Sequence, residues 1–88
     1  MASTSRFKRD LKRLHRQNKT IDKLELLINL IATCSPLPPK NKDHGLIGNY
    51  AGYRECHIEP DWLLIYRIDN KKKTIILVRT GCHAELFR

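Results

Sequence analysis

Three histidines and one aspartate stand out as side chains that could do chemistry, because each falls in a loop, in a turn or at the end of a predicted strand. His57 ends the first predicted strand, Asp61 lies in the turn that follows, and His83 comes just after the third strand. His44 lies in a glycine-containing loop before the first strand. In an antiparallel meander the first and third strands run parallel to each other, so His57, Asp61 and His83 should lie at the same end of the sheet. The same spacing is also compatible with surface histidines that share no role.

This set of side chains suits the cleavage of RNA, which carries its own nucleophile in the 2′-hydroxyl group. A base must take the hydroxyl proton and an acid must protonate the leaving 5′-oxygen, and an imidazole can do either because it titrates near neutral pH. Arg79 stands four residues before His83, so we expect its guanidinium to reach the same region and hold phosphate oxygens. Trp62 and Phe87 are candidates for stacking on an unpaired base.

Two Cys-His pairs, Cys56-His57 and Cys82-His83, raise the question of a metal site. Adjacent side chains on a strand point to opposite faces, so Cys56 and His57 are not expected to bind one ion together. The sequence contains neither a Cys-x-x-Cys nor a His-x-x-x-His spacing. We therefore predict a reaction that needs no metal and no cofactor. The chain has three cysteines, Cys34, Cys56 and Cys82. They are too few for a disulfide scaffold and indicate reduced thiols in a cytoplasmic protein.

The first element that must support these residues is a helix near the N-terminus. Phe7, Leu11 and Leu14 recur at positions i, i+4 and i+7, which is the spacing of one helical face. Ser5 is the expected N-cap. Basic side chains fill the other faces and are expected to point to solvent: Lys8, Arg9, Lys12, Arg13 and Arg16.

A second helix is predicted to begin after Thr20, a good N-cap, and to end before the proline-rich residues 35–39. Leu26 and Leu30 broaden its apolar stripe, so we expect burial on more than one side. The stripe itself comprises Ile21, Leu24, Leu27, Ile28 and Ile31.

Strand patterns dominate the second half of the chain. Residues 53–58, 62–68 and 74–80 are rich in β-branched, aromatic and other apolar residues and are separated by polar turns. We predict one α+β domain over residues 1–88, in which two N-terminal helices pack on one face of an antiparallel sheet of three to four strands. The fourth strand would be a short one before Phe7. The opposite face of the sheet is then free to carry a site.

The charge of the chain indicates a polyanionic partner. Its 88 residues include 17 Lys and Arg against 9 Asp and Glu, which gives a net charge of +8. Seven of the basic residues lie among residues 1–20, and Lys71-Lys72-Lys73 forms a second block. RNA, DNA or an acidic protein would fit such a surface, and so would a basic face that serves only solubility. No apolar run reaches eighteen residues, so no membrane span is expected.

Four ordered stretches of the sequence are similar to a known toxin family. They read DHGL at residues 43–46, GNY at 48–50, GYRECHIEPDWLLIY at 52–66 and RTGCHAELF at 79–87. Together they closely resemble the YafQ branch of the RelE superfamily, the toxins of bacterial toxin–antitoxin pairs. The resemblance implies a compact RelE-like fold and an mRNA endonuclease that works in the ribosomal A site. It also implies metal-free attack by the 2′-hydroxyl, which leaves a 2′,3′-cyclic phosphate.

The resemblance further implies partners and site residues. The partners would be mRNA, the ribosome and a cognate antitoxin, with operator DNA reached only through the antitoxin complex in the bacterial cytoplasm. The catalytic positions of the family fall on His44, His57, Asp61, His83 and Phe87, with contributions from Arg79 and Glu55. Candidate contacts to RNA are Trp62, Arg54 and four basic residues of the first helix, Lys8, Arg9, Lys12 and Arg13.

Two other functions compete with this one. In the first, the chain is a non-catalytic binding module whose basic helices hold nucleic acid or an acidic protein such as an antitoxin. In the second, it is a toxin relative that has lost its activity and acts only in an antitoxin complex on operator DNA. The complete set of histidines argues against both.

Overall fold

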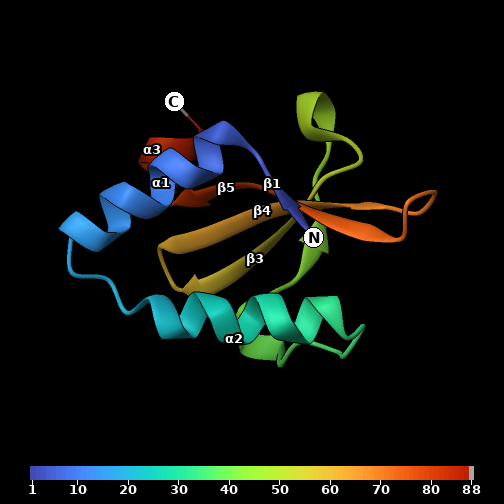
Figure 1. The fold of residues 1–88 in the computed structure, drawn as a ribbon, viewed down its shortest axis with the longest axis horizontal. Helices are drawn as coiled ribbons and strands as arrows, with labels where there is room; N and C mark the ends of the chain where they lie inside the picture. The colour runs from blue at the N-terminus through green and yellow to red at the C-terminus, as the bar shows by residue number, and fades with distance from the viewer. Residues whose placement is uncertain (88) are drawn as a thin grey trace.

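Three consecutive strands form the predicted meander at the centre of the sheet. In the computed structural model, which describes residues 1–87, these strands are β3 (Arg54–Glu59), β4 (Trp62–Asp69) and β5 (Thr74–Gly81). β3 pairs with β4 and β4 pairs with β5, both in the antiparallel sense (Figure 1). The predicted strands are confirmed, and each boundary lies within one residue of its expected place.

Two short strands extend the sheet at its edges. β1 (Ala2–Ser3) runs parallel to β5, and β2 (His44–Gly45) runs antiparallel to β3, so the strand order is β1-β5-β4-β3-β2. The α+β fold is therefore confirmed, including the short strand before Phe7. The sheet is one strand wider than the upper prediction, and it is mixed because β1 runs parallel to its neighbour.

The first helix, α1 (Ser5–Arg16), is capped by Thr4. The Thr4 hydroxyl accepts a hydrogen bond from the Phe7 N–H at 3.0 Å and donates one to the Val78 carbonyl at 2.6 Å. The predicted N-cap, Ser5, is wrong by one residue, because the pairing of β1 with β5 fixes the point at which the chain turns into the helix. The predicted apolar stripe faces the sheet, where Phe7 is 3% exposed.

The second helix, α2 (Ile21–Ala32), begins directly after Thr20, as predicted. Leu27 is 5% exposed, whereas its neighbour Leu26 is 62% exposed. The expected burial on more than one side is wrong for Leu26, because consecutive residues point about 100° apart around a helix and the sheet covers only one side. No helix within residues 1–87 has the length and apolar character needed to cross a membrane.

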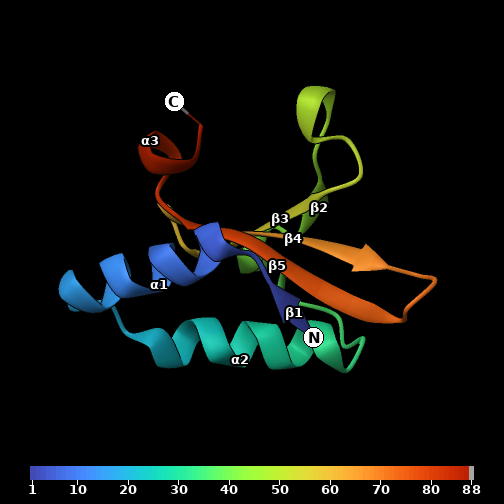
Figure 2. The same ribbon diagram turned by 45° about the horizontal axis from the view of Figure 1, so that its top comes forward.

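The two faces of the sheet carry cores of unequal size. α1 and α2 lie along one face, where Trp62 and Leu64 of β4 are buried beneath them (Figure 2). On the other face Leu63 and Ile65 of β4 form a smaller cluster with Leu86. β4 is therefore buried on both sides, as expected for a central strand.

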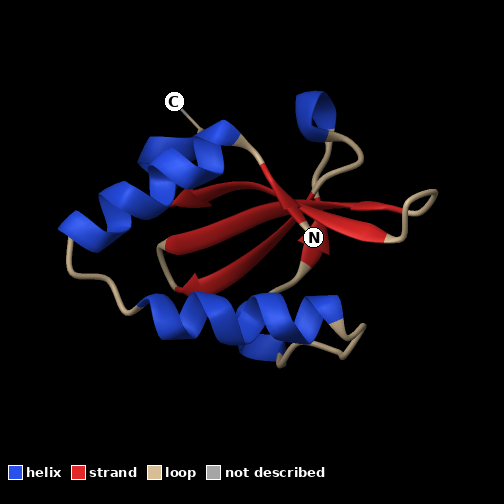
Figure 3. Ribbon diagram, viewed as in Figure 1, coloured by secondary structure: helices blue, strands red, loops and turns tan. Residues whose placement is uncertain are grey.

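The residues after β5 form a short helix. α3 (His83–Leu86) follows Cys82, which occupies the N-cap position. The Glu85 carboxylate accepts a hydrogen bond from the Cys82 N–H at 3.0 Å. Helices thus border the sheet on both of its faces (Figure 3), and α3 lies on the face opposite to α2.

The one-sided burial of α2 predicts different effects for two adjacent leucines. Leu27→Ala should lower the free energy of unfolding by about 2–5 kcal/mol, because it leaves a cavity in the core. Leu26→Ala, the matched control, should change it by no more than about 0.5 kcal/mol, since the side chain is exposed. Urea denaturation of the two variants measures both values, and equal destabilisation would contradict the described orientation of α2.

Candidate active site

His83 and Asp61 make contact where the β3–β4 turn meets the end of β5. His83 Nδ1 lies 2.9 Å from Asp61 Oδ1, and the backbone N–H of His83 donates to the same oxygen at 3.2 Å. The ring centroids of His57 and His83 are 6.0 Å apart. The structure therefore brings His57, Asp61 and His83 to one end of the sheet, as the strand directions predict.

A second pairing of imidazole with carboxylate lies beside the first. Glu55 is buried on β3, and its Oε1 lies 3.2 Å from His57 Nε2 and 4.0 Å from His44 Nε2. His44 comes this close because β2 pairs it directly with Glu55. From the sequence we predicted a loop at His44, because a strand of two residues is too short to show a period.

The two carboxylates of the site have different surroundings. Asp61 is exposed, and the hydrogen bonds that it accepts from the side chain and backbone of His83 lower the pKa of its carboxyl. Glu55 is 7% exposed at its side chain and faces His57, which is itself only 15% exposed. His83, at 54% exposed, is directly open to a ligand, whereas Glu55 and His57 are largely buried.

A cluster of aromatic rings borders His83. The Phe87 ring centroid lies 6.2 Å from that of His83 and 5.5 Å from that of Tyr50, with the Tyr50 and Phe87 rings edge-to-face. Tyr53 adds a third ring 6.2 Å from Tyr50. Phe87 is 39% exposed, so its ring is accessible to a base. Sequence reasoning missed Tyr50 and Tyr53, although both fall inside the stretches that resemble the toxin family.

Arg79 is anchored rather than free. Its Nε and Nη2 donate to the carboxylate of Asp10 on α1 at 3.0 Å and 2.9 Å. These bonds raise the pKa of Arg79. Asp10 therefore orients the guanidinium fork of Arg79, while Nη1 takes no part in these two bonds.

The prediction that Trp62 stacks on RNA is wrong. Trp62 is 1% exposed, and its Nε1–H donates to the Thr80 hydroxyl at 3.0 Å within the core. Because the sequence of β4 is apolar on both faces, it does not show whether the Trp62 ring contacts a ligand or packs against α1 and α2. Trp62 instead stabilises β4, of which it is the first residue.

The expected solvent exposure of the basic residues on α1 holds for four of the five. Arg13 is the exception, because its guanidinium donates to Asp10 at 2.9 Å and lies 2.7 Å from a carboxylate oxygen of Glu85. Arg13 is therefore not free to bind RNA phosphates. The exposed members are Lys8, Arg9, Lys12 and Arg16.

Arg54, the other candidate RNA contact, is the first residue of β3, three residues before His57. Its Nε is 3.3 Å from Asp43 Oδ1, which also accepts a hydrogen bond from the Tyr66 hydroxyl at 2.7 Å. The Arg54 side chain is 40% exposed, so it stays accessible to a ligand.

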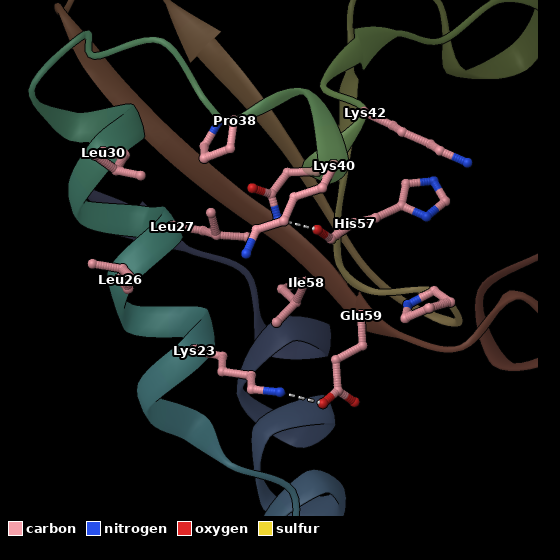
Figure 4. A pocket seen from close by; sticks show the side chains of 12 residues that line it. Lys23, Leu26, Leu27, Leu30, Pro38, Lys40, Lys42, His57, Ile58 and Glu59 are labelled. Carbon is pink, nitrogen blue, oxygen red and sulfur yellow. Dashed lines mark hydrogen bonds and ion pairs between the residues drawn. The ribbon is translucent and has the colours of Figure 1, made fainter.

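A hollow of about 490 Å³ lies behind His57, between α2 and β3 (Figure 4). Leu27 and Leu30 form part of its wall, and an ion pair of 2.8 Å between Lys23 and Glu59 closes one end. Neither Asp61 nor His83 lines this hollow. His57 borders the hollow, but Asp61 and the exposed His83 do not, so the hollow is not the place where the acid–base groups converge.

Within the site, the carboxylate of Glu55 faces His57 and His44, and that of Asp61 faces His83. Within residues 1–87, no three side chains of His, Cys, Asp or Glu converge so that they could hold one metal ion. Imidazoles in contact with carboxylates are suited to moving and orienting protons.

Comparisons with known proteins extend over nearly the whole chain. A family model described as the bacterial toxin of type II toxin–antitoxin systems, YafQ, matches residues 1–88. The mRNA interferase toxin YafQ of Escherichia coli K12 is 40% identical over 85 residues, which cover 96% of this chain and 90% of that protein. The crystal structure of a metal-bound toxin from Helicobacter pylori superposes with a TM-score of 0.93 at 42% identity, and the match covers 98% of this chain and 96% of that one. The crystal structure of the E. coli DinJ–YafQ toxin–antitoxin complex gives a TM-score of 0.89 at 39% identity, covering 99% of this chain and 94% of that one.

The contact between Asp61 and His83 predicts that the pKa of Asp61 depends on His83. His83→Ala should raise the pKa of Asp61 toward its ordinary value of 3.8, because the largest cause of its lowering is lost. The carboxyl carbon of Asp61, followed by NMR over pH, measures the change. Glu59, whose pKa is lowered mainly by its hydrogen bond from Lys23, is the internal control and should titrate as in the unmodified protein. An unchanged midpoint for Asp61 would contradict the pairing.

Proposed function

Since this chain belongs to the YafQ family of toxins from bacterial type II toxin–antitoxin systems, we propose that it is an endoribonuclease that cleaves mRNA on the ribosome and is inhibited by a cognate antitoxin. The observation that carries the proposal is the cluster of His57, Asp61 and His83 on an open face, with the imidazole of His83 in contact with Asp61. Such a cluster offers both a proton acceptor and a proton donor within reach of one phosphodiester.

The proposed reaction transfers a phosphoryl group within the RNA. One imidazole of the site takes the proton of the 2′-hydroxyl, and the 2′-oxygen forms a bond to the adjacent phosphorus. The bond from phosphorus to the 5′-oxygen breaks, and a second imidazole gives its proton to that leaving oxygen. The products are a 2′,3′-cyclic phosphate and a 5′-hydroxyl, so no water and no redox partner is consumed.

The remaining groups of the site would stabilise and orient the RNA. Arg79 presents a cation whose orientation is set by Asp10, which suits it to the negative charge that grows on the phosphate oxygens. Phe87, next to His83, offers a ring on which an unpaired base can stack. Glu55 and Asp61 would hold the imidazoles of His57 and His83 in a fixed tautomer and orientation.

The net charge supports the proposed partners. With a charge of +8, the chain is attracted to ribosomal RNA and to an acidic antitoxin alike. The E. coli relative is found in a complex named DinJ–YafQ, and we extend this type of partnership to the present chain. Operator DNA would then be reached through the antitoxin complex.

Loss of the exposed imidazole should abolish cleavage. His83→Ala should lower the rate of RNA cleavage by about 10²–10⁴-fold, the usual contribution of general acid–base catalysis. His15→Ala is the matched control, because His15 is an exposed histidine on α1, away from the cluster, and its loss should leave the rate unchanged. Primer extension on mRNA incubated with ribosomes and each variant measures the cleavage. A His83→Ala variant that cleaves at the original rate would remove His83 from the mechanism, whereas an unmodified protein that cleaves no mRNA would favour the binding-module alternative.

The exposed basic face of α1 should contribute to ribosome binding. Replacing Lys8, Arg9 and Lys12 by Gln should weaken binding and flatten its salt dependence, because each phosphate contact contributes about −0.7 to −0.9 to the slope of log K against log salt. The control replaces Lys71, Lys72 and Lys73 of the β4–β5 turn by Gln, which removes the same charge, and should have the smaller effect.

Sedimentation of ribosomes with each variant, at several salt concentrations, gives both slopes. Equal losses for the two triple variants would show that net charge alone matters and that α1 is not the docking surface.

A further inference from the structure

A buried acid lies in the middle of the basic helix α1. Asp10 is 2% exposed, and its carboxylate accepts two hydrogen bonds from Arg79, one from Arg13 at 2.9 Å and one from the Thr80 backbone N–H at 3.1 Å. Burial raises the pKa of the carboxyl, but these donors outweigh it and keep the pKa below its ordinary value. A buried charge is costly unless partners compensate it, and here two guanidinium groups do so.

Arg13 carries this network on to the helix that bears His83. The Nη2 of Arg13 donates to the Thr80 carbonyl at 3.1 Å, and its Nε lies 2.7 Å from Glu85 Oε2. The other oxygen of Glu85 accepts the hydrogen bond from the Cys82 N–H. One chain of contacts therefore runs from α1, past the end of β5, to α3.

The backbone at Gly81 leaves room for these contacts. A Cβ at this position would lie 2.7 Å from Arg13 Nη2 and 2.9 Å from Glu85 Oε1, both closer than real Cβ contacts allow. The side chains of Arg13 and Glu85 therefore meet across a residue that has no side chain of its own.

Helix α3 depends on such contacts for its position. It has four residues, of which only Leu86 is buried, and a helix of this length is not stable by itself. It carries His83 at its first position and is followed by Phe87. Asp61 holds the start of α3 on the side of the β3–β4 turn, and Glu85 holds it on the side of α1.

We propose that Asp10 is a positioning residue of the active site: it orients Arg79 directly and, through Arg13 and Glu85, fixes α3 where His83 meets Asp61. This inference rests on the proposed function, because it assigns a role in RNA cleavage to groups that do not touch the RNA. The residue that positions the active site would then lie on α1, on the face of the sheet opposite to the reacting groups.

Two substitutions of Glu to Gln test the connection between α1 and α3. Glu85→Gln removes the charge that faces Arg13 but keeps an oxygen that can accept the Cys82 N–H, so it separates the network from the capping of α3. Glu59→Gln is the matched control, because it removes the same charge from a carboxylate that pairs with Lys23 of α2. Glu85→Gln should lower kcat about 10- to 100-fold, since a displacement of about 1 Å costs up to about 10²-fold. KM for the RNA should stay the same, and Glu59→Gln should change neither constant. Equal kcat values for the two variants would overturn the proposal.

The direct effect of Asp10 on Arg79 is tested by a double-mutant cycle. Asp10→Asn should lower kcat in the unmodified protein but much less in an Arg79→Lys background, because the orientation of the guanidinium is already lost there. Losses that multiply would show that Asp10 supports only the fold, and would overturn its role in positioning Arg79. Thermal melting shows whether each variant is folded at the assay temperature; should Asp10→Asn unfold, Glu85→Gln decides the proposal.

A measurement without RNA separates this inference from the proposed function. The rings of His57 and His83 are close enough for an NMR cross-peak between their protons, and this cross-peak should persist in Glu59→Gln and disappear in Glu85→Gln. Its persistence in Glu85→Gln would overturn the positioning of α3. If the unmodified protein cleaves no RNA, the proposed function fails, while the cross-peak still decides whether the network fixes α3.

Discussion

Burial of β4 on both faces is the constraint on which the rest of the molecule depends. From Trp62 to Tyr66 every side chain is at most 2% exposed, with alternate residues facing the helices α1 and α2 and the cluster beneath α3. β3 and β5 pair with this strand on either side, and Leu86 packs α3 against it. The strands that carry His57 and Arg79 therefore pair directly with a strand that cannot shift without exposing the core. Asp61, which directly precedes Trp62, is held at the edge of that rigid region.

The end of the sheet at which the site forms could be predicted from the sequence. The alternation of strands and turns fixes the direction of each strand, and the direction decides which strand ends lie together. His57, Asp61 and His83 were found in this way, because each of them follows or ends a strand with a clear pattern. The pairing of Glu55 with His44 was not, since β2 has only two residues and its register depends on the sheet that it joins.

Other features depend on tertiary neighbours that no local pattern encodes. The residue type of Leu26 or Trp62 does not show whether the side chain is exposed to water or covered by a helix. Its burial depends on contacts with residues far along the chain. Arg13 shows the same limit for charge, because its exposure depends on Asp10 and Glu85 being close enough to compensate it. Exposed charges contribute little to stability and are free to serve binding, whereas buried ones are bound to their partners.

The large sequence separation of the Asp10 contacts has a consequence for when the protein can fold. Asp10 bonds the backbone of Thr80, 70 residues further along, and β1 pairs with β5 over a similar separation. A chain that is still growing therefore leaves this carboxylate in water until β5 has been synthesised. Contacts of such long range form slowly and as part of the whole fold. A partly made or partly unfolded chain thus carries the histidines but not their arrangement, and the chemistry begins and ends together with the tertiary structure.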